Sequence, residues 1–364
     1  CTLGYELGGS FSRPATHTSP EADELARLAR EMRDHGATHL VMEVSSIALA
    51  ARRADGVRFR VAAFTNLTQD HLDYHGTMDA YAEAKARLFT ELGPGSAAIN
   101  VEHALGRALA LRIPRGTRVA RYTSKPDLAA ADVYPERAAL GSKGIELSVH
   151  TPIGTVEIRS PLLGAHNVEN LLCAVAIGVM LDLSVDAIGR GLSTDVRVPG
   201  RLERCDDPEL DDVVVLVDYA HTPDALARVL ASVRGVSGGA VVCVMGCGGD
   251  RDPLKRPLMG KAAGAGADRV IVTNDNPRSE DPRAIADQIV PGLAETGTPF
   301  VVELDRAAAI HAAVLEARPG DVVVVAGKGH ETYQIIGPTT YAFDDRDVAR
   351  AALVARRQAR GGAA

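Results

Sequence analysis

The stretch VVVLVDYAHTPDALARVLASV, residues 213–233, contains the pair of elements that decides the fold. Its first residues, 213–217, are valine or leucine and predict a short buried strand. Residues 222–233 repeat apolar side chains at helical spacing and predict a helix directly after that strand. A short apolar strand followed by a helix is typical of parallel sheets whose strands are joined by helical crossovers.

The same alternation continues toward the C-terminus. It predicts strands at 240–245, 269–273, 300–304 and 321–326, and helices near 257–265, after Pro282 and near 307–317. A domain boundary is expected near RVPG (197–200), so residues 198–364 are predicted to form a doubly wound, Rossmann-like domain. The last residues, 356–364, are expected to be a frayed tail.

Residues 1–197 show the same α/β character. Short β-branched runs predict buried strands at 38–44 and 59–67, and helical spacing predicts helices at 78–92 and 167–183. One region interrupts this pattern, because the two short runs on either side of TPIG (151–154) predict an antiparallel hairpin. We therefore predict a second α/β domain with a parallel sheet over residues 1–197.

Composition limits the classes of function. The formal net charge of −7 argues against a nucleic-acid partner, since phosphate binding needs clustered Lys and Arg. No run of eighteen apolar residues predicts a membrane span. The five cysteines are scattered and odd in number, which is typical of a reducing cytoplasm rather than a disulfide framework. We expect a cytoplasmic monomer with no membrane contact.

Polar loops follow the predicted strands of the second domain. GCGGDRD (246–252), TNDNPR (273–278) and GKGHE (327–331) each come directly after a strand, where ligands bind in α/β sheets. Arg side chains bind carboxylates bidentately, and Asp or Glu side chains bind ammonium groups. Arg251, Asp275, Arg278 and Glu331 together therefore suit a zwitterionic amino acid. The alternative is ordinary salt bridging within the loops.

A second group of polar residues follows the predicted strands of the first domain. Glu43 ends the first strand, and His71 lies in the dense polar loop after the second. A carboxylate at a strand end could hold Mg²⁺, which prefers one or two carboxylates plus phosphate oxygens. Alternatively, these side chains cap the following helices. Lys85, on the next helix, by itself predicts only a surface lysine whose stem covers apolar neighbours.

Eight motifs in a fixed order resemble the Mur ligase family. They are MEVSS (42–46), FTNLTQDHLDYHGTMDAYAEAKARLF (64–89), AHNVENLLCA (165–174), VPGRLE (198–203), VDYAHTPDAL (217–226), GCGGDRD (246–252), DNPR (275–278) and GKGHE (327–331). The resemblance covers nearly the whole chain and favours the family members that add diaminopimelate. It implies a central ATPase-type parallel sheet, lacking its N-terminal part, within 1–197, and a Rossmann-like domain that binds the amino acid at 198–364.

The resemblance also implies an activity, an ATP-dependent amide ligase of peptidoglycan precursor synthesis. Such an enzyme uses ATP and Mg²⁺ to join meso-diaminopimelate to the D-Glu of UDP-MurNAc-L-Ala-D-Glu. Lys85 matches the lysine that is carbamylated in the family and serves with Glu43 and His71 in Mg²⁺ binding. Because a carbamate is an anion, this role replaces the surface-lysine interpretation.

Further site residues are carried over on matching positions. Precursor-binding positions are Thr18, Ser19, Ser45 and Arg53, and positions in ATP-contacting stretches are Asn167, Asn170, Arg201 and Asp218. Positions for the amino acid are Arg251, Asp275, Asn276, Pro277, Arg278, Gly327 and Glu331. In this scheme Arg278 pairs with the distal carboxylate that distinguishes diaminopimelate from lysine, since burying that group unpaired costs several kcal/mol. Lysine-adding relatives lack this arginine.

The sequence departs from the family in three places. The family's UDP-binding N-terminal domain and its P-loop (GTxGKT/S) do not occur in residues 1–364, and Ile47 stands where the family usually has His, near an atypical Ala51-Arg52. We expect a fragment that does not hydrolyse ATP efficiently by itself. The alternative is a non-catalytic paralogue that binds muramyl peptide or diaminopimelate. Folylpolyglutamate synthetase and cyanophycin-type ligases are further alternatives, and DNPR with GKGHE argues against both.

Overall fold

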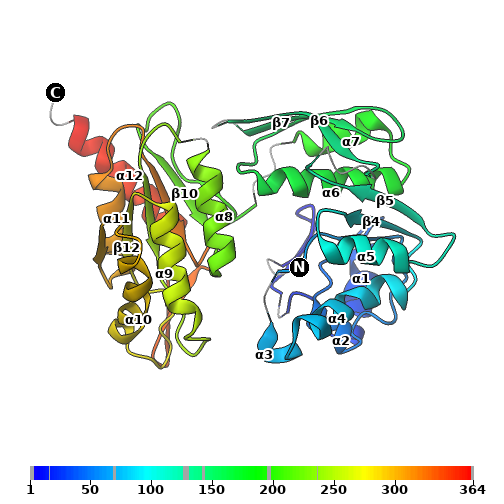
Figure 1. Ribbon diagram of the computed structural model, residues 1–364, viewed down its shortest axis with the longest axis horizontal. Coiled ribbons are helices and arrows are strands. Elements are labelled where there is room, and N and C mark those ends of the chain that lie inside the picture. The colour runs from blue at the N-terminus through cyan, green and yellow to red at the C-terminus, as the bar shows by residue number, and fades with distance from the viewer. Residues whose placement is uncertain are drawn as a thin grey trace. The chain divides into compact units, whose positions relative to one another are not determined.

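The computed structural model describes residues 4–15, 17–68, 71–125, 131–141, 144–194, 198–235 and 237–361. The chain divides into two compact units. The first comprises residues 1–138, 146–159 and 168–193, and the second comprises 139–145, 160–167 and 194–364. Both combine helices with short strands, so the predicted α/β class with parallel sheets is confirmed (Figure 1).

The first half of the chain carries short strands and mostly short helices. In order these are β1 (Tyr5–Leu7), β2 (Phe11–Arg13), α1 (Ala22–Asp34), α2 (Ser46–Ala50), β3 (Val61–Phe64), α3 (Leu72–His75), α4 (Met78–Thr90), β4 (Ser96–Asn100), α5 (Ala104–Arg112), β5 (Arg118–Tyr122), β6 (Tyr134–Gly141), β7 (Gly144–His150), β8 (Val156–Ser160), α6 (His166–Met180) and α7 (Val185–Leu192). The hairpin predicted around TPIG is present as β7 and β8.

A parallel sheet ordered β3-β4-β5 is the centre of the first unit. All of β4 is buried, and Phe64, Ile99 and Phe89 belong to one apolar cluster with it. Helix α4 begins where Thr77 accepts a hydrogen bond from the amide of Ala80 at 3.2 Å. The helix predicted at 78–92 and the strand predicted at 59–67 are therefore present, with narrower bounds.

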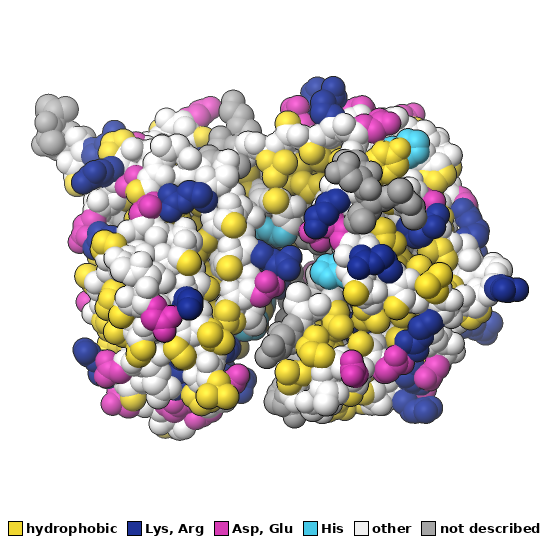
Figure 2. All heavy atoms as spheres, in the orientation of Figure 1, with side chains coloured by type: hydrophobic (Ala, Val, Ile, Leu, Met, Phe, Trp, Pro, Cys, Tyr) yellow, Lys and Arg dark blue, Asp and Glu magenta, His cyan; other side chains and the backbone are white. Residues whose placement is uncertain are grey.

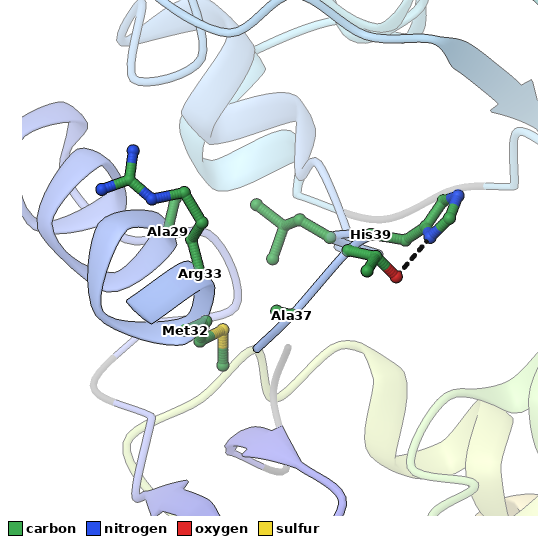
Figure 3. A pocket seen from close by; sticks show the side chains of 7 residues that line it. Ala29, Met32, Arg33, Ala37 and His39 are labelled. Carbon is green, nitrogen blue, oxygen red and sulfur yellow. Dashed lines mark hydrogen bonds between the residues drawn. The ribbon is translucent and has the colours of Figure 1, made fainter. Parts of the chain in front are cut away.

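The strand predicted at 38–44 is wrong. Residues 38–45 carry no strand in the structure, and Val41 is 91% and Leu40 47% exposed. A β-branched run needs a neighbouring strand to pair with, and in the described part of the chain β3 pairs only with β4. The segment instead lies beside α1, where Met32, Ala37 and His39 line a small pocket (Figure 3).

The second unit contains a longer set of elements. They are β9 (Glu203–Arg204), β10 (Val214–Asp218), α8 (Pro223–Arg234), β11 (Val241–Met245), α9 (Lys255–Gly266), β12 (Arg269–Val272), α10 (Pro282–Ala294), β13 (Phe300–Val302), α11 (Arg306–Glu316), β14 (Val322–Ala326), β15 (Tyr333–Ile336), β16 (Thr339–Ala342) and α12 (Asp345–Gly361). Every strand and helix predicted from 213 to 326 is present, with ends that shift by a few residues.

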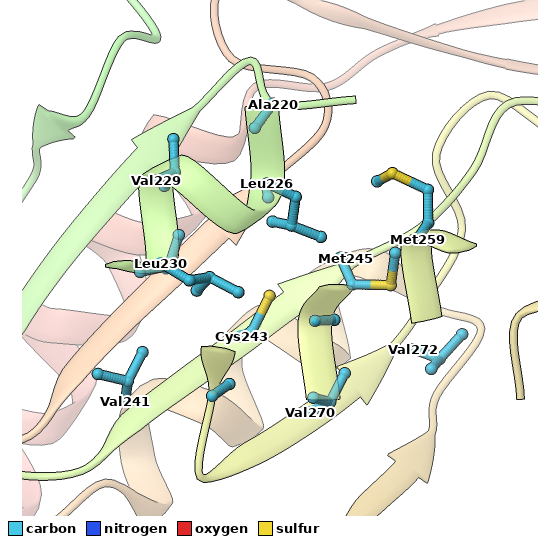
Figure 4. Packing of buried hydrophobic residues seen from close by; sticks show 14 of the residues in the cluster. Ala220, Leu226, Val229, Leu230, Val241, Cys243, Met245, Met259, Val270 and Val272 are labelled. Carbon is cyan, nitrogen blue, oxygen red and sulfur yellow. The ribbon is translucent and has the colours of Figure 1, made fainter. Parts of the chain in front are cut away.

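A six-stranded sheet ordered β13-β12-β11-β14-β10-β9 is described in this unit, and all pairs except β10-β9 are parallel. Alternate residues of each strand face opposite sides of the sheet. Cys243 and Met245 belong to a cluster with residues of α8 and α9 (Figure 4), and Val242 and Val244 belong to a second cluster with residues of α11 and α12. Helices therefore cover both faces, as in a doubly wound fold. The chain moves outward from β11 and returns at β14, which makes the carboxyl ends of these two neighbours the topological switch point.

The frayed tail predicted at 356–364 is wrong for its described part, because α12 continues to Gly361. Ala349, Ala352 and Leu353 are fully buried against the sheet. Beyond them, Arg356 donates to Asp212 at 2.8 Å and Arg357 to Asp211 at 2.7 Å. These partners are distant in sequence, so the local pattern did not reveal them.

Candidate functional site

Three loops meet at the carboxyl ends of the central strands of the second unit. They follow β11 (246–252), β12 (273–278) and β14 (327–331), and we call them the strand-end loops. Glycines allow their close approach, because a Cβ at Gly246 would overlap the carbonyl oxygen of Thr273 and one at Gly249 that of Pro277. The amide of Gly249 donates to the carbonyl of Asn276 at 2.9 Å and joins the first two loops.

Two arginines converge beside Gly248. The nearest atoms to a Cβ placed there would be Nη1 of Arg278 and Cγ of Arg251, at 3.0 and 3.6 Å. Nη1 of Arg278 also donates to the carbonyl of Gly249 at 2.7 Å, which orients its guanidinium. Arg278 has a left-handed backbone, with φ of 52°. A non-glycine residue held in this region is uncommon and often belongs to a functional loop.

The acidic residues of the strand-end loops lie close by. Glu331 Oε2 accepts a hydrogen bond from Nδ2 of Asn276 at 2.9 Å. A Cβ at Gly327 would lie 2.8 Å from Oδ2 of Asp275, so Gly327 is required for the carboxylate to occupy its place. Burial raises the pKa of Tyr333. The negative charges of Glu331 and Asp275 raise it further, whereas the positive charges of Arg278 and Arg251 lower it. One tyrosine hydroxyl thus experiences all four charges that the sequence assigned to the amino acid.

A hairpin that the sequence analysis missed supports the middle loop. Strands β15 and β16 pair with each other, and the main chain of Ile335 accepts from the amide of Arg278 at 3.1 Å. The amide of Gly337 donates back to the carbonyl of Arg278 at 2.7 Å, and Gln334 Nε2 donates to the carbonyl of Asp275 at 2.9 Å. The Gly337-Pro338 pair between the two strands was the available turn signal.

A buried arginine, Arg256, stabilises the strand-end loop that follows β11. Arg256 is 1% exposed and donates to both carboxylate oxygens of Glu280 at 2.8 Å and to Gly248 at 3.3 Å. The hydrogen bonds from Arg256 are the main cause that lowers the pKa of Glu280 to about 2. Glu280 Oε1 in turn accepts from the amide of Asp250 at 2.6 Å. Neither residue was identified from the sequence.

The residues carried over for ATP lie partly together in the second unit. Asp218 is buried, which raises its pKa, and its carboxylate accepts from the amides of Leu202 and Ala220 at 2.7 and 2.8 Å. The guanidinium of Arg201 stands 5.0 Å from the centre of the Tyr219 ring. Tyr219 also contacts His330 at 5.1 Å between ring centres. Burial and the nearby Arg201 lower the pKa of His330.

Asn167 lies at the start of α6, where its Nδ2 donates to the carbonyl of Leu163 at 2.7 Å. The preceding His166 has its pKa lowered by burial and by Arg201, which places this end of α6 near Arg201 within the second unit. Asn170 is exposed and belongs to the first unit. The Arg201, Tyr219 and His330 group offers flat faces and a cation, which suit a purine base with its phosphates.

The positions carried over for precursor binding lie in the first unit. Ser19 is buried and its Oγ donates to the carbonyl of Glu43 at 2.9 Å while accepting from the amide of Ser45 at 2.9 Å. Arg53 donates to the carbonyl of Ser19 at 3.4 Å and pairs with Glu21 at 2.7 Å. Thr18 precedes Ser19 and is half-buried. Ile47 lies on α2, two residues after Ser45.

Tyr81 joins the residues carried over for catalysis. Its buried ring stacks on His75 at 5.1 Å, meets His71 edge-on at 6.1 Å and lies 5.2 Å from Nζ of Lys85. Lys85 Nζ also donates to the carbonyl of Asn66 at 3.4 Å. Tyr81 is thus a common neighbour of His71 and Lys85, a role that its place in an amphipathic helix does not reveal.

The donor set tests whether Mg²⁺ fits here. Among the described residues no three His, Cys, Asp or Glu side chains lie close enough to hold a metal together. Mg²⁺, however, usually takes one or two protein ligands with water and phosphate oxygens, so a carboxylate and a lysine carbamate suffice. Lys85 and His71 both contact Tyr81, and the main chain of Glu43 joins Ser19. By the chemistry of its donors, rather than by a formed cluster, this set of residues suits Mg²⁺.

The remaining features concern the surface charge, the length of the helices and the buried cysteines. Figure 2 shows Lys and Arg side chains interspersed with Asp and Glu over the visible face, in keeping with the formal charge of −7. In the part of the chain that the structure describes, no helix is long and apolar enough to cross a bilayer. Burial raises the pKa of Cys243 and Cys247 to about 12, so both thiols are protonated at neutral pH.

Comparisons with known proteins found similar family models, relatives and a solved structure. Residues 1–178 match the Mur ligase middle domain, and residues 200–329 match the Mur ligase, glutamate ligase domain. A UDP-N-acetylmuramoyl-L-alanyl-D-glutamate–2,6-diaminopimelate ligase of Gloeobacter violaceus is 48% identical over 354 residues, which cover 97% of this chain and 71% of the relative. The enzyme of the same name from Synechococcus elongatus is 48% identical over 357 residues, covering 98% and 70%.

A solved structure is similar as well. It is described as a UDP-N-acetylmuramoyl-L-alanyl-D-glutamate–2,6-diaminopimelate ligase and is 36% identical in sequence. The similarity covers 96% of this chain and 72% of the solved chain, with a TM-score of 0.67.

Proposed function

The chain belongs to the Mur ligase family, and on this premise we propose that it is an ATP-dependent amide ligase that joins meso-diaminopimelate to the D-Glu of UDP-MurNAc-L-Ala-D-Glu. The observation that carries the proposal is the meeting of the strand-end loops. Arg251 and Arg278 flank Gly248, while Glu331 and Asp275 lie on the neighbouring loops. Relatives that are 48% identical over almost the whole chain bear the name of this activity.

The strand-end loops suit an amino acid with charge at both ends. We assign Arg278 to the distal carboxylate of diaminopimelate, because the carbonyl of Gly249 already orients its guanidinium beside Gly248 and Arg251. Arg251 then serves the second carboxylate, and Asp275 and Glu331 serve an ammonium group. Three further residues hold these side chains in place. Asn276 donates a hydrogen bond to Glu331, and the main chains of Pro277 and Gly327 pack closely against Gly249 and Asp275.

We divide the remaining chemistry along the chain. Residues 1–197 activate the carboxylate and residues 198–364 bind the amino acid. Thr18, Ser19, Ser45 and Arg53 hold the precursor, and Asn167, Asn170, Arg201 and Asp218 contact ATP. The stacking of Arg201 on Tyr219 and the half-buried His330 support a base-binding role for this group.

The reaction has two steps. An oxygen of the D-Glu γ-carboxylate attacks the γ-phosphorus of ATP, ADP leaves, and an acyl phosphate forms. The neutral amine of diaminopimelate then attacks the acyl carbon, the carbon–oxygen bond to phosphate breaks, and the amine loses its proton. Glu43, His71 and carbamylated Lys85 would hold Mg²⁺, which would supply positive charge beside the transferring phosphoryl group. The protein contributes mainly by positioning and by charge stabilisation.

The test is incorporation of labelled meso-diaminopimelate into a UDP-linked product, with phosphate release measured in parallel. It is run on the 364-residue chain and on the same chain with a GTxGKT/S segment added before residue 1. Phosphate release is expected to require ATP, precursor and diaminopimelate together, with L-lysine a poor replacement. Binding of diaminopimelate without turnover in either form would favour the non-catalytic paralogue, and equal use of lysine would contradict the assignment of Arg278.

A further inference from the structure

Lys328, within GKGHE, has no role in the reaction as described above. Its side chain is fully buried at 0% exposure, which is rare for lysine unless the ammonium is paired. Nζ donates to Oε2 of Glu331 at 3.0 Å and to Oδ1 of Asn276 at 3.1 Å. It also lies 5.4 Å from the centre of the Tyr333 ring. A buried cation is therefore directed at the acid assigned to the substrate.

Lys328, Asn276 and Glu331 form a closed polar group, which we call the Lys328 cluster. Asn276 accepts from Lys328 through Oδ1 and donates to Glu331 through Nδ2, so both neighbours fix the orientation of its amide. The amide of Ile335 donates to the same Oδ1 at 2.9 Å. Each member thus restrains the other two, and the hairpin restrains the group from one side.

Charge balance explains why a cation is needed there. The residues that we assign to the amino acid include two acids, Asp275 and Glu331, and two arginines, Arg251 and Arg278, while the other two acids of the strand-end loops, Asp250 and Asp252, are exposed to solvent. Diaminopimelate that is ready to attack has two carboxylates and one ammonium group, because its attacking amine is neutral. It therefore carries one net negative charge into the site. Lys328 supplies the matching positive charge, and a buried charge without a partner is strongly disfavoured.

We propose that Lys328 is a positioning residue for the amino acid substrate: its ammonium holds Glu331 and Asn276 in the geometry that receives diaminopimelate. The inference rests on the proposed function. Lys328 does not itself touch the substrate in this scheme, since its ammonium is enclosed by Glu331, Asn276 and Tyr333. Its effect on binding passes through Glu331.

The competing explanation is that Lys328 only stabilises the fold. A double-variant comparison separates the two, because residues that act through one another give non-additive effects. Lys328→Met keeps the length of the side chain and removes the charge. Glu331→Gln keeps the shape of its side chain and removes the acid. The double variant leaves no uncompensated charge, so it is expected to fold even where Lys328→Met alone does not.

The experiment is calorimetric titration of each protein with meso-diaminopimelate, with thermal unfolding as the fold control. Glu331→Gln and Lys328→Met are each expected to weaken binding about 10- to 100-fold, the range of a charge-assisted hydrogen bond. Lys328→Met in the Glu331→Gln background is expected to change binding by less than about twofold.

Two outcomes would overturn the proposal: wild-type affinity in Lys328→Met, or an equal further loss in the Glu331→Gln background. Where Lys328→Met does not fold, the double variant is compared with Glu331→Gln alone, and a further loss of binding of more than about twofold would overturn the proposal. The proposed function fails separately, through absence of binding to the wild-type protein or wild-type affinity in Glu331→Gln.

Discussion

The main chain of Ile335 accepts a hydrogen bond from the amide of Arg278 at 3.1 Å, so strand β15 holds Arg278 in its left-handed conformation. The guanidinium that we assign to the distal carboxylate is thus fixed at two points, since Nη1 also donates to Gly249 at 2.7 Å. A side chain held in this way loses little freedom when it binds a ligand, which favours affinity and discrimination.

Replacing Arg278 is expected to separate binding from backbone strain. Arg278→Ala and Arg278→Gly both remove the guanidinium and are expected to raise the KM for diaminopimelate about 10- to 100-fold, with the KM for ATP nearly unchanged. Only glycine tolerates a φ of 52° without cost, so Arg278→Gly is expected to be about 1 kcal/mol more stable than Arg278→Ala. Steady-state kinetics and denaturant unfolding measure the two effects. An unchanged KM for diaminopimelate in both variants would refute the assignment.

Lys85 is expected to be essential for turnover. Lys85→Ala removes the amine that carries the carbamate and is expected to abolish phosphate release, with partial recovery on adding short-chain carboxylates. Lys85→Arg is the matched variant, because it keeps the positive charge beside Tyr81 but cannot form a carbamate. It is expected to be inactive as well. Near-normal turnover in Lys85→Arg would show that a cation, not a carbamate, is required.

Gly249 is expected to tolerate no side chain. A Cβ there would overlap the carbonyl oxygen of Pro277, so Gly249→Ala forces the first two strand-end loops apart. We expect a loss of about 1–3 kcal/mol in unfolding free energy and a higher KM for diaminopimelate. Gly238→Ala is the control, because a Cβ at Gly238 meets nothing within 4 Å. Equal stability of the two variants in denaturant titrations would contradict the close approach of the loops.

The Arg256–Glu280 pair predicts a dependence of stability on pH. The pKa of Glu280 falls from 4.5 to about 2 in the folded protein, chiefly through hydrogen bonds from Arg256. A lowered folded-state pKa gives stability that is present above about pH 4.5 and is lost as the pH falls toward about 2. Wild type is therefore expected to exceed Glu280→Gln in unfolding free energy at neutral pH, with a difference that shrinks below about pH 4.5. A difference that stays constant down to pH 3 would exclude this linkage.

Local sequence patterns predicted the second unit well. The strands from Val214 to Ala326 are short apolar runs bounded by turn residues, and the helices between them have clear apolar faces. Because parallel strands end at one edge of a sheet, the positions of Arg251, Asp275 and Glu331 after strands were enough to predict polar loops near one another.

Other features depend on partners that are distant in sequence. Val41 has strand-forming neighbours but no described strand to pair with, so its segment forms no strand and Val41 stays exposed. A lysine in a polar loop is expected at the surface, yet hydrogen bonds to Asn276 and Glu331 allow Lys328 to be completely buried. The arginines at the end of α12 were predicted to lie in a frayed tail, because their partners Asp211 and Asp212 are distant in sequence. In each case the deciding interaction is tertiary.

One buried ion pair links helix α12 to two of the strand-end loops. Arg306 and Asp345 are both fully buried and lie 2.7 Å apart, and Arg306 also donates to the carbonyls of Asn274 and Ala326 at 2.9 and 3.1 Å. These carbonyls immediately precede Asp275 and Gly327. Grafting loops from a relative with another amino-acid preference would therefore require its C-terminal helix as well, since the first residue of α12 sets where two of those loops begin.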